Sequence, residues 1–140
     1  MIAIGEVRVR VELINSVDEG LVRRGLLNPD QVRKYTADAL VDTGAIPSVL
    51  PIHVVQQLGL AIIGKGRAEY ANGYEETVDR TEAVVIAIDG RRVTEETLVL
   101  GSEVLIGQTV LELMDLLVDH VNQRVIPNPA HPDQPVLKVK

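Results

Sequence analysis

The chain contains no cysteine, no tryptophan and no phenylalanine, and only three tyrosines among its 140 residues. Without cysteine there is no disulfide, no zinc–thiolate site and no thiol nucleophile. No apolar run approaches the roughly 20 residues that a membrane-spanning helix requires. The first residues also lack the basic, apolar and small-residue order of a signal peptide. We therefore expect a soluble cytoplasmic protein with no membrane partner.

Excess positive charge is also missing. The net charge is −6, and the acidic residues are scattered along the chain. Nucleic acid attracts basic surfaces, so we expect no nucleic-acid partner. Hydrophobic residues make up 46% of the sequence, which excludes a disordered chain. A chain of this length buries one core, and here Val, Leu, Ile and Ala must fill it.

Short segments with strand-like patterns are frequent. In residues 5–15, Val and Leu alternate with Arg and Glu, which is the period of a strand with one solvated face. Asn72-Gly73, flanked by two tyrosines, is a strong signal for a β-hairpin within residues 67–80. Further strands are expected at residues 35–42, 81–88, 93–100, 116–118, 124–126 and 136–139.

Signals for helices are fewer. Pro51 precedes apolar residues at helical spacing and Gly59 follows them, so residues 51–58 are expected to form a short helix. A second short helix is expected at residues 108–114, with Val110, Leu111 and Met114 facing inward. Seven or more strands with one or two helices indicate an all-β barrel or sandwich.

Two segments have no strong strand or helix pattern. Residues 16–34 form a long polar connection, with short helical turns expected at residues 18–24 and 30–34. Residues 127–135 hold four prolines, which exclude a regular helix and a central strand.

Asp42 is the most informative residue, because it ends an apolar run at residues 39–41. Aspartate is disfavoured in strands and is rarely buried without a partner. No Lys or Arg lies between Lys34 and Lys65, so no cation nearby in the sequence offsets this carboxylate. Such an acid has either a compensating group or a chemical use, and its best available partner is a second copy of itself.

Asp42-Thr43-Gly44-Ala45, read together with the segments that follow, resembles the signature of the retropepsin-like aspartic proteases (clan AA). The resemblance covers about residues 7–126, and the long polar connection is more similar to bacterial members than to viral ones. It implies a closed β-barrel of the acid protease type at residues 1–126, followed by a Pro-rich tail at residues 127–140. Two further parts are implied: a flap at Tyr70, Ala71, Asn72, Gly73 and Tyr74, and a second apolar-apolar-Gly segment at Leu105, Ile106 and Gly107.

The resemblance also implies a mechanism, namely an aspartic endopeptidase that needs no cofactor and no metal. Two carboxyl groups a few Å apart share one proton, so one serves as base and the other as acid toward water and an amide. The chain has one Asp-Thr-Gly, so the pair requires a homodimer in which Asp42 meets its symmetry mate. Thr43 would bridge to the partner loop, Gly44 would allow close backbone approach, and Ala45 would keep the floor of the site small. The partner molecules would be a second subunit and an extended peptide under the flap.

Three alternatives stay open at this point. The chain is a catalytically silent member of the same fold that binds peptide or dimerises, or a monomeric barrel in which the pair never assembles. In the third alternative, Asp42 only caps a turn, since Asp-Thr-Gly also suits turns.

Other patterns do not carry a function. Residues 59–65 fit the start of a phosphate-loop pattern, but Gly66 stands where a magnesium-binding Ser or Thr is needed, and the spacer is apolar. We therefore reject a nucleotide site.

The histidines and serines carry no site either. His53, His120 and His131 are far apart in sequence and show no metal-ligand spacing. Ser48 and Ser102 lack the context of a hydrolase nucleophile.

Overall fold

The computed structural model describes residues 6–140, which form a bent sheet, a small two-stranded sheet and three short α-helices. Gly5, where the first predicted strand begins, lies outside the described residues. In chain order the elements are β1 (Val7–Asn15), α1 (Ser16–Arg23), the 3-10 turn η1 (Pro29–Gln31), β2 (Lys34–Val41), β3 (Val49–Leu50), α2 (Ile52–Leu58), β4 (Ile62–Glu69), β5 (Glu75–Thr81), β6 (Val84–Ile88), β7 (Arg91–Glu95), β8 (Leu98–Val99), β9 (Leu105–Ile106), α3 (Gln108–Met114), β10 (Leu116–Asp119) and β11 (Arg124–Pro127).

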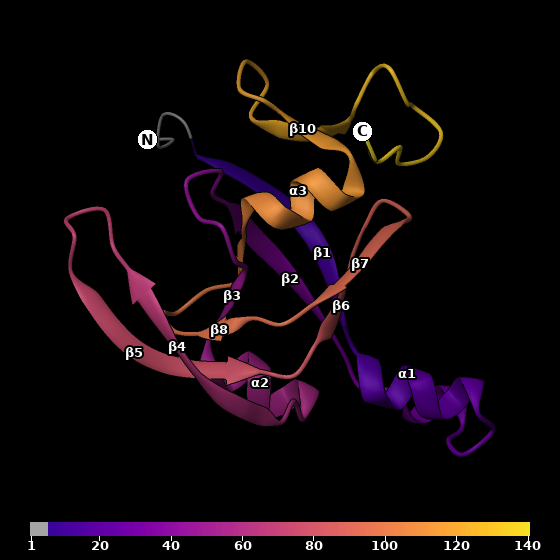
Figure 1. Cartoon of the computed structure of the whole chain (residues 1–140). Helices are drawn as coiled ribbons and strands as arrows, with labels where there is room; N and C mark the ends of the chain where they lie inside the picture. Colours follow the sequence, from indigo (N-terminus) through magenta and orange to yellow (C-terminus); the bar gives the residue numbers. More distant parts are fainter. Residues whose placement is uncertain (1–5) are drawn as a thin grey trace.

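The large sheet is an open half-barrel. Its nine strands follow the order β4-β5-β8-β3-β9-β2-β1-β6-β7, so β4 and β7 are edge strands that pair on one side only. Figure 1 shows the β4–β5 hairpin extending away at one end of the sheet, while β7 approaches α3 at the other. The closed barrel expected from the sequence is therefore wrong for residues 6–140, because neither edge meets the other. Residues 6–140 also hold three α-helices rather than one or two.

At the centre of the sheet, β9 lies between β2 and β3. It pairs in parallel with β2 and antiparallel with β3, although β3 directly follows β2 in the chain apart from a loop at residues 42–48. This topology makes residues 42–48 cross over the end of β9. We call these residues the Asp42 loop.

An aliphatic core fills the concave side of the sheet, as the sequence predicts. Removing such side chains from water is the main stabilising contribution to a fold of this size. Its fully buried members include Leu13, Ala39, Leu50, Leu58, Ile86, Ile106, Val110 and Met114.

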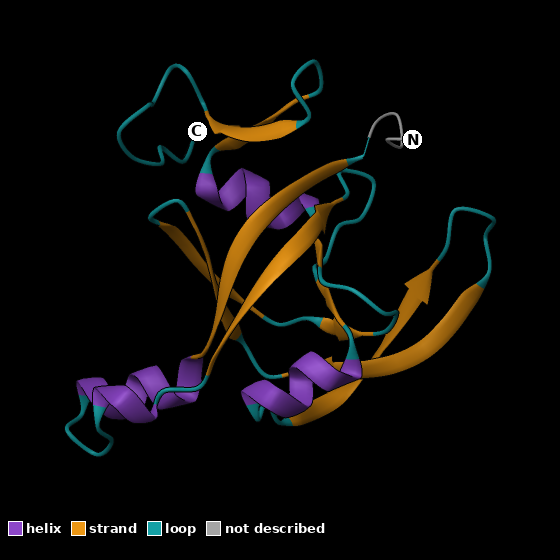
Figure 2. Ribbon diagram, turned by 180° about the vertical axis from the view of Figure 1, so that it is seen from behind, coloured by secondary structure: helices purple, strands orange, loops and turns teal. Residues whose placement is uncertain are grey.

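The helices lie at two ends of the molecule (Figure 2). Helices α1 and α2 lie at one end, and α3 lies at the other beside the β10–β11 hairpin. Helix α2 begins after Pro51 and ends at Gly59, whose φ of 64° is the left-handed conformation that favours glycine. Helix α3 buries Val110, Leu111 and Met114. Both predicted helices are thus confirmed, including the inward face of α3.

The polar connection at residues 16–34 is held by an ion pair between the buried Asp18 and the half-exposed Arg33. Arg33 donates from Nε and Nη2 to the two Asp18 carboxylate oxygens, at 2.8 and 2.9 Å. This pairing lowers the pKa of Asp18. Asn15 caps α1 by accepting from the Asp18 N–H and donates to the Leu58 carbonyl at 2.7 Å. The two expected helical turns are present, as α1 and η1.

Two long predicted strands are each divided in the structure. Residues 81–88 contain the end of β5 and the whole of β6, and residues 93–100 contain parts of β7 and β8. The chain bends between the members of each pair, because β8 leaves β7 to pair with β3 and β5. No helix within residues 6–140 is long and apolar enough to cross a bilayer.

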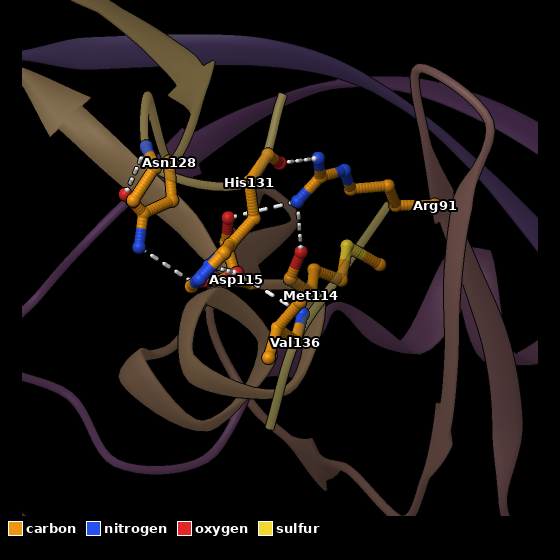
Figure 3. Close-up of polar contacts among 7 residues, drawn as sticks. Arg91, Met114, Asp115, Asn128, His131 and Val136 are labelled. Carbon is orange, nitrogen blue, oxygen red and sulfur yellow. Dashed lines mark hydrogen bonds and ion pairs between the residues drawn. The ribbon is translucent and has the colours of Figure 1, made fainter. Parts of the chain in front are cut away.

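The C-terminal part is anchored by polar contacts rather than by strand pairing. The strand predicted at residues 136–139 is wrong: the described chain has no regular structure after β11. Figure 3 shows why the tail nevertheless has a defined path. Asp115 accepts hydrogen bonds from Asn128 Nδ2 at 3.0 Å and the Val136 N–H at 3.1 Å, and it contacts His131 Nδ1 at 2.6 Å.

The buried Arg91 completes this anchor. Its guanidinium donates to the carbonyls of Met114 and Asp115 at 2.8 and 2.9 Å, and to the His131 carbonyl at 2.8 Å. A planar fork with several N–H donors can serve three carbonyls at once. Arg91 therefore joins β7, the end of α3 and the tail.

Candidate active site

Asp42 lies directly after β2, partly buried, at the start of the Asp42 loop. Its N–H donates to the Ile106 carbonyl at 3.0 Å, which continues the parallel pairing of β2 with β9. Its carboxylate accepts the N–H of Gly44 at 2.9 Å, and its carbonyl accepts the N–H of Ala45 at 3.1 Å. The side chain is thus held by the backbone of its own turn.

Two glycines are required by close contacts around this turn. A Cβ on Gly44 would lie 3.2 Å from Asp42 Oδ1, tighter than ordinary van der Waals contact. A Cβ on Gly107 would lie 2.4 Å from the Pro47 carbonyl oxygen and 2.6 Å from that of Ile46, so no side chain fits there. The apolar-apolar-Gly segment is therefore explained by the passage of the Asp42 loop over β9.

The Asp42 loop also caps helix α3. The N–H of Gln108 donates to the Ala45 carbonyl at 2.8 Å, and the N–H of Thr109 donates to the Ile46 carbonyl at 3.3 Å. The N–H of Gly107 donates to Oγ of the buried Ser48 at 3.1 Å. A helix N-terminus leaves several N–H groups without partners, and α3 has no side-chain cap. Loop and helix therefore fix each other.

A groove of about 690 Å³ lies beside Asp42. Five consecutive residues at 67–71 line one side of it, and the remaining lining is mostly apolar. Successive strand side chains point to opposite faces, so consecutive lining residues indicate that the edge of β4 faces the groove. The lining comprises Asp42, Gly44, Ala45, Ile46 and Pro47 of the loop, residues 67–71 and Gly73 of the hairpin, and Val49, Leu98, Leu100 and Leu105 below.

The predicted flap is a β-hairpin formed by β4 and β5. Its turn is closed by the N–H of Tyr70 to the Tyr74 carbonyl and the N–H of Gly73 to the Tyr70 carbonyl, both at 2.8 Å. Gly73 has φ of 84°, and Asn72 Oδ1 accepts the Tyr74 N–H at 2.9 Å. The two tyrosine rings stack with centroids 5.8 Å apart. The Asn72-Gly73 hairpin is thus confirmed in shape.

Most, but not all, of the predicted site residues meet at the groove. Tyr70, Ala71 and Gly73 line it, whereas Asn72 and Tyr74 do not. Leu105 lines it, while Ile106 is in the core and Gly107 contacts the loop. Thr43 is exposed, and its hydroxyl makes no hydrogen bond within residues 6–140.

The histidine, aspartate and glutamate side chains of the described residues are not gathered into one cluster. Residues 6–140 contain no group of three or more His, Asp or Glu side chains that could hold a metal ion. No histidine and no serine lines the groove. The ring of His53 packs edge-on against Tyr35, with centroids 6.5 Å apart, and His131 binds Asp115.

Sequence reasoning did not single out Thr109, which contacts the Asp42 loop, or Glu95, which contacts Thr109. Thr109 Oγ1 lies 3.0 Å from the Ile46 carbonyl oxygen and 3.0 Å from Glu95 Oε2. Glu95 lies 14 residues from Thr109 in the sequence, and no local pattern joins them.

Comparison with known proteins identifies the class. The profile of the aspartyl protease family matches residues 30–118, and the chain belongs to this family. In fold it is similar to the retroviral protease-like domain of Ddi1 from Leishmania major, with a TM-score of 0.53 and 15% identity over 88% of this chain and 90% of that one. It also matches the EIAV protease complexed with the inhibitor HBY-793, with a TM-score of 0.48 and 25% identity over 55% of this chain and 75% of that one. No curated protein sequence matches. The retropepsin-like family predicted from the Asp42 signature is confirmed.

Proposed function

We propose that the protein is an aspartic endopeptidase that acts as a homodimer, with Asp42 of each subunit forming the catalytic pair. The observation that carries this proposal is the position of Asp42, which ends a central strand beside a groove of about 690 Å³. Membership of the aspartyl protease family supports it independently.

The geometry of the Asp42 loop supports pairing with a second copy. The Asp42 carboxylate accepts one hydrogen bond within the described chain, from Gly44, so its other lone pairs are available. Thr43 is exposed beside it, in a suitable place to bind the corresponding loop of a partner. Ile46 has 72% of its surface exposed, and a second subunit would cover part of this apolar surface.

In the assembled pair, two carboxyls at close range hold one proton between them. The ionised member takes a proton from water, and the oxygen of that water attacks the peptide carbonyl carbon. The protonated member gives its proton to the carbonyl oxygen, which gives a neutral tetrahedral diol. Collapse of this diol breaks the C–N bond: the first carboxyl gives the proton that it took from water to the leaving nitrogen, and the second carboxylate takes a proton from a diol hydroxyl. The pair titrates as a unit.

The edge of β4 supports binding of an extended peptide. It is the last strand of the sheet, and its outer N–H and C=O groups have no strand partner within residues 6–140. A peptide that added to this edge would place alternate side chains into the groove. The hairpin turn at residues 70–74 would cover it and exclude water.

One alternative has an observation in its favour. The groove and the free edge of β4 belong to a single subunit, whereas the carboxyl pair does not. A peptide-binding module of the same fold would therefore need no dimer and no chemistry. Such a module would bind peptide equally well with Asn at position 42.

A subunit-mixing experiment tests the shared pair. Wild-type chain and Asp42→Asn chain are refolded together at several ratios, and peptide cleavage is measured per wild-type chain. With random pairing, equal amounts should reduce cleavage per wild-type chain to about half, because mixed dimers lack one carboxyl. Unchanged cleavage per wild-type chain would reject the pair, and sedimentation at micromolar concentration would reveal whether dimers are present.

Three narrower points stay predictions from the sequence. They are the similarity to bacterial members, the division of the chain after residue 126, and the cytoplasmic location.

A further inference from the structure

The hydroxyl group of Thr109 faces two hydrogen-bond acceptors. It lies 3.0 Å from the Ile46 carbonyl oxygen of the Asp42 loop, and 3.0 and 3.3 Å from the two carboxylate oxygens of Glu95 on β7. A threonine hydroxyl has one proton to donate and two lone pairs with which to accept. It therefore cannot donate fully to both acceptors at once.

The charge of Glu95 decides which acceptor receives the proton. When the Glu95 carboxyl is ionised it only accepts, and a charge-assisted hydrogen bond is stronger than a neutral one. The Thr109 proton then goes to Glu95, and the Ile46 carbonyl keeps only the Thr109 N–H at 3.3 Å. An uncharged side chain at position 95 that donates to Thr109 Oγ1 would let the Thr109 O–H turn to the Ile46 carbonyl.

We propose that Thr109 and Glu95 are positioning residues for the Asp42 loop, and that the Glu95 carboxylate loosens this loop by holding the Thr109 hydroxyl. The proposal rests on the proposed function in one respect: the loop matters for catalysis only if Asp42 reacts. The number of hydrogen bonds to the loop changes whether or not the protein cleaves peptides.

The loop is short enough to transmit this change. Ile46 follows Ala45, whose N–H binds the Asp42 carbonyl and whose own carbonyl binds the Gln108 N–H. A second hydrogen bond on the Ile46 carbonyl would therefore restrict the same turn that orients the Asp42 carboxylate.

Other charged groups around Glu95 are engaged elsewhere. Strand β7 packs on β6, which carries no charged residue, and on α3, whose one charged residue is Glu112. The Glu112 carboxylate accepts from Gln108 at 3.4 Å. Glu95 itself forms no ion pair within residues 6–140, which makes Thr109 the main polar partner of its carboxylate. The other charged side chains of the strand and its end are also paired: Arg91 with three carbonyls, Arg92 with Glu19, and Glu96 with Arg80.

The test measures amide hydrogen exchange in the full-length protein by NMR, at the N–H groups of Ala45 and Thr109. Exchange of wild type and variants is compared in one buffer and corrected for intrinsic rates. Glu95→Gln should raise protection by about threefold to tenfold over wild type, the change expected for one added hydrogen bond.

Four variants separate the proposal from a general structural effect. Glu95→Gln offers an amide N–H to Thr109 Oγ1, so the Thr109 O–H can turn to the Ile46 carbonyl. Thr109→Val has the same shape without a hydroxyl, so adding Glu95→Gln to it should not raise protection, whereas Thr109→Ser should respond to Glu95→Gln as wild type does. Glu96→Gln removes a neighbouring charge and should leave protection unchanged. If Glu95→Gln keeps wild-type protection, or raises protection equally in the Thr109→Val background, the proposal is wrong.

Kinetics connect this result to the reaction. Glu95→Gln should raise kcat by about threefold to tenfold with little change in KM, because the added bond affects the orientation of Asp42 rather than the groove, and Thr109→Val should remove this gain. If wild type cleaves no peptide, the proposed function fails while the exchange result still decides the role of Thr109. A change in KM with kcat unaltered would overturn the positioning role.

Discussion

Asp42 and Asp115 are associated with opposite ends of helix α3, and their carboxylates are used differently. The Asp42 loop binds the N-terminal end of the helix, whereas Asp115 follows its C-terminal end. Within residues 6–140, the Asp42 carboxylate accepts one hydrogen bond, from Gly44, and lies beside the groove. The Asp115 carboxylate is instead surrounded by Asn128, His131 and Val136 (Figure 3).

The difference in hydrogen-bond partners distinguishes a carboxylate that anchors the tail, Asp115, from one whose oxygens are available for a reaction, Asp42. The hydrogen bond from Asn128, followed by those from Val136 and His131, lowers the pKa of Asp115 to about 2. Donors of this kind stabilise the ionised form. A carboxylate in that environment is a poor proton carrier at neutral or mildly acidic pH. Asp42 lacks this set of donors, which agrees with the shared proton that we propose for it.

Both ends of α3 are held through backbone N–H or C=O groups that have no hydrogen-bond partner within the helix. At the N-terminal end, N–H groups hold the carbonyls of Ala45 and Ile46. At the C-terminal end, the Arg91 guanidinium binds the carbonyls of Met114 and Asp115, where the helix dipole favours a cation. One seven-residue helix thus positions both the candidate active site and the C-terminal tail.

Among the variants that test this comparison of the two carboxylates, Asp42→Asn is expected to have the largest effect. Loss of a general acid–base group should reduce kcat for peptide cleavage by about 10²- to 10⁴-fold. The free energy of unfolding should change by less than about 0.5 kcal/mol, since the side chain accepts one hydrogen bond and Asn Oδ1 can accept it as well. Cleavage assays and urea titrations on the same preparation measure both. Equal cleavage by wild type and variant would remove Asp42 from the mechanism.

A smaller effect is expected where the Asp42 loop meets α3. Gly107→Ala places a Cβ within 2.4 Å of the Pro47 carbonyl oxygen, so loop and helix must separate. We expect a loss of about 1–3 kcal/mol in the free energy of unfolding, with reduced cleavage. Gly20→Ala is the matched control: its Cβ would meet only Arg23 at 3.5 Å, and alanine favours helix α1. If both variants are equally stable, the close contact at Gly107 is not a constraint.

Helix α2, the inward face of α3 and the Asn72-Gly73 hairpin could all be predicted, because their signals are local. Pro51 and Gly59 mark the two ends of α2 within nine residues of sequence. The position of Asp42 at a strand end follows from the apolar run before it. Each of these features depends on neighbouring residues alone.

The open sheet, the tail and the polar network could not be predicted. Whether β4 and β7 meet depends on how the whole sheet bends, which no short pattern records. Asp115 binds partners 13 to 21 residues away, and Arg91 reaches a carbonyl 40 residues away. Residues 136–139 look like a strand by composition, but the partner they would need is absent from the described sheets. Thr109 and Glu95 escaped notice for the same reason.

The smallest expected effect concerns the tail alone, and it tests the other half of the comparison. The pKa of Asp115 is lowered from its ordinary value near 3.8 to about 2. A carboxylate with a lowered pKa in the folded state stabilises it above the unfolded value, and this contribution is lost as pH falls through the folded value. Protection of the Val136 amide should therefore be complete above about pH 4 and disappear toward about pH 2.

Asp115→Asn should remove this pH dependence and leave Val136 weakly protected throughout. Asn tolerates the left-handed backbone at position 115, where φ is 55°, so the turn after α3 should survive. Asp119→Asn is the control, because Asp119 also binds neighbouring donors but lies in the β10–β11 turn region, away from Val136. Amide exchange of Val136 by NMR measures all three proteins. Since the proposed cleavage depends on the opposite end of α3, Asp115→Asn should keep the kcat of wild type. A loss of kcat as large as that of Asp42→Asn would mean that the two ends of the helix do not act separately.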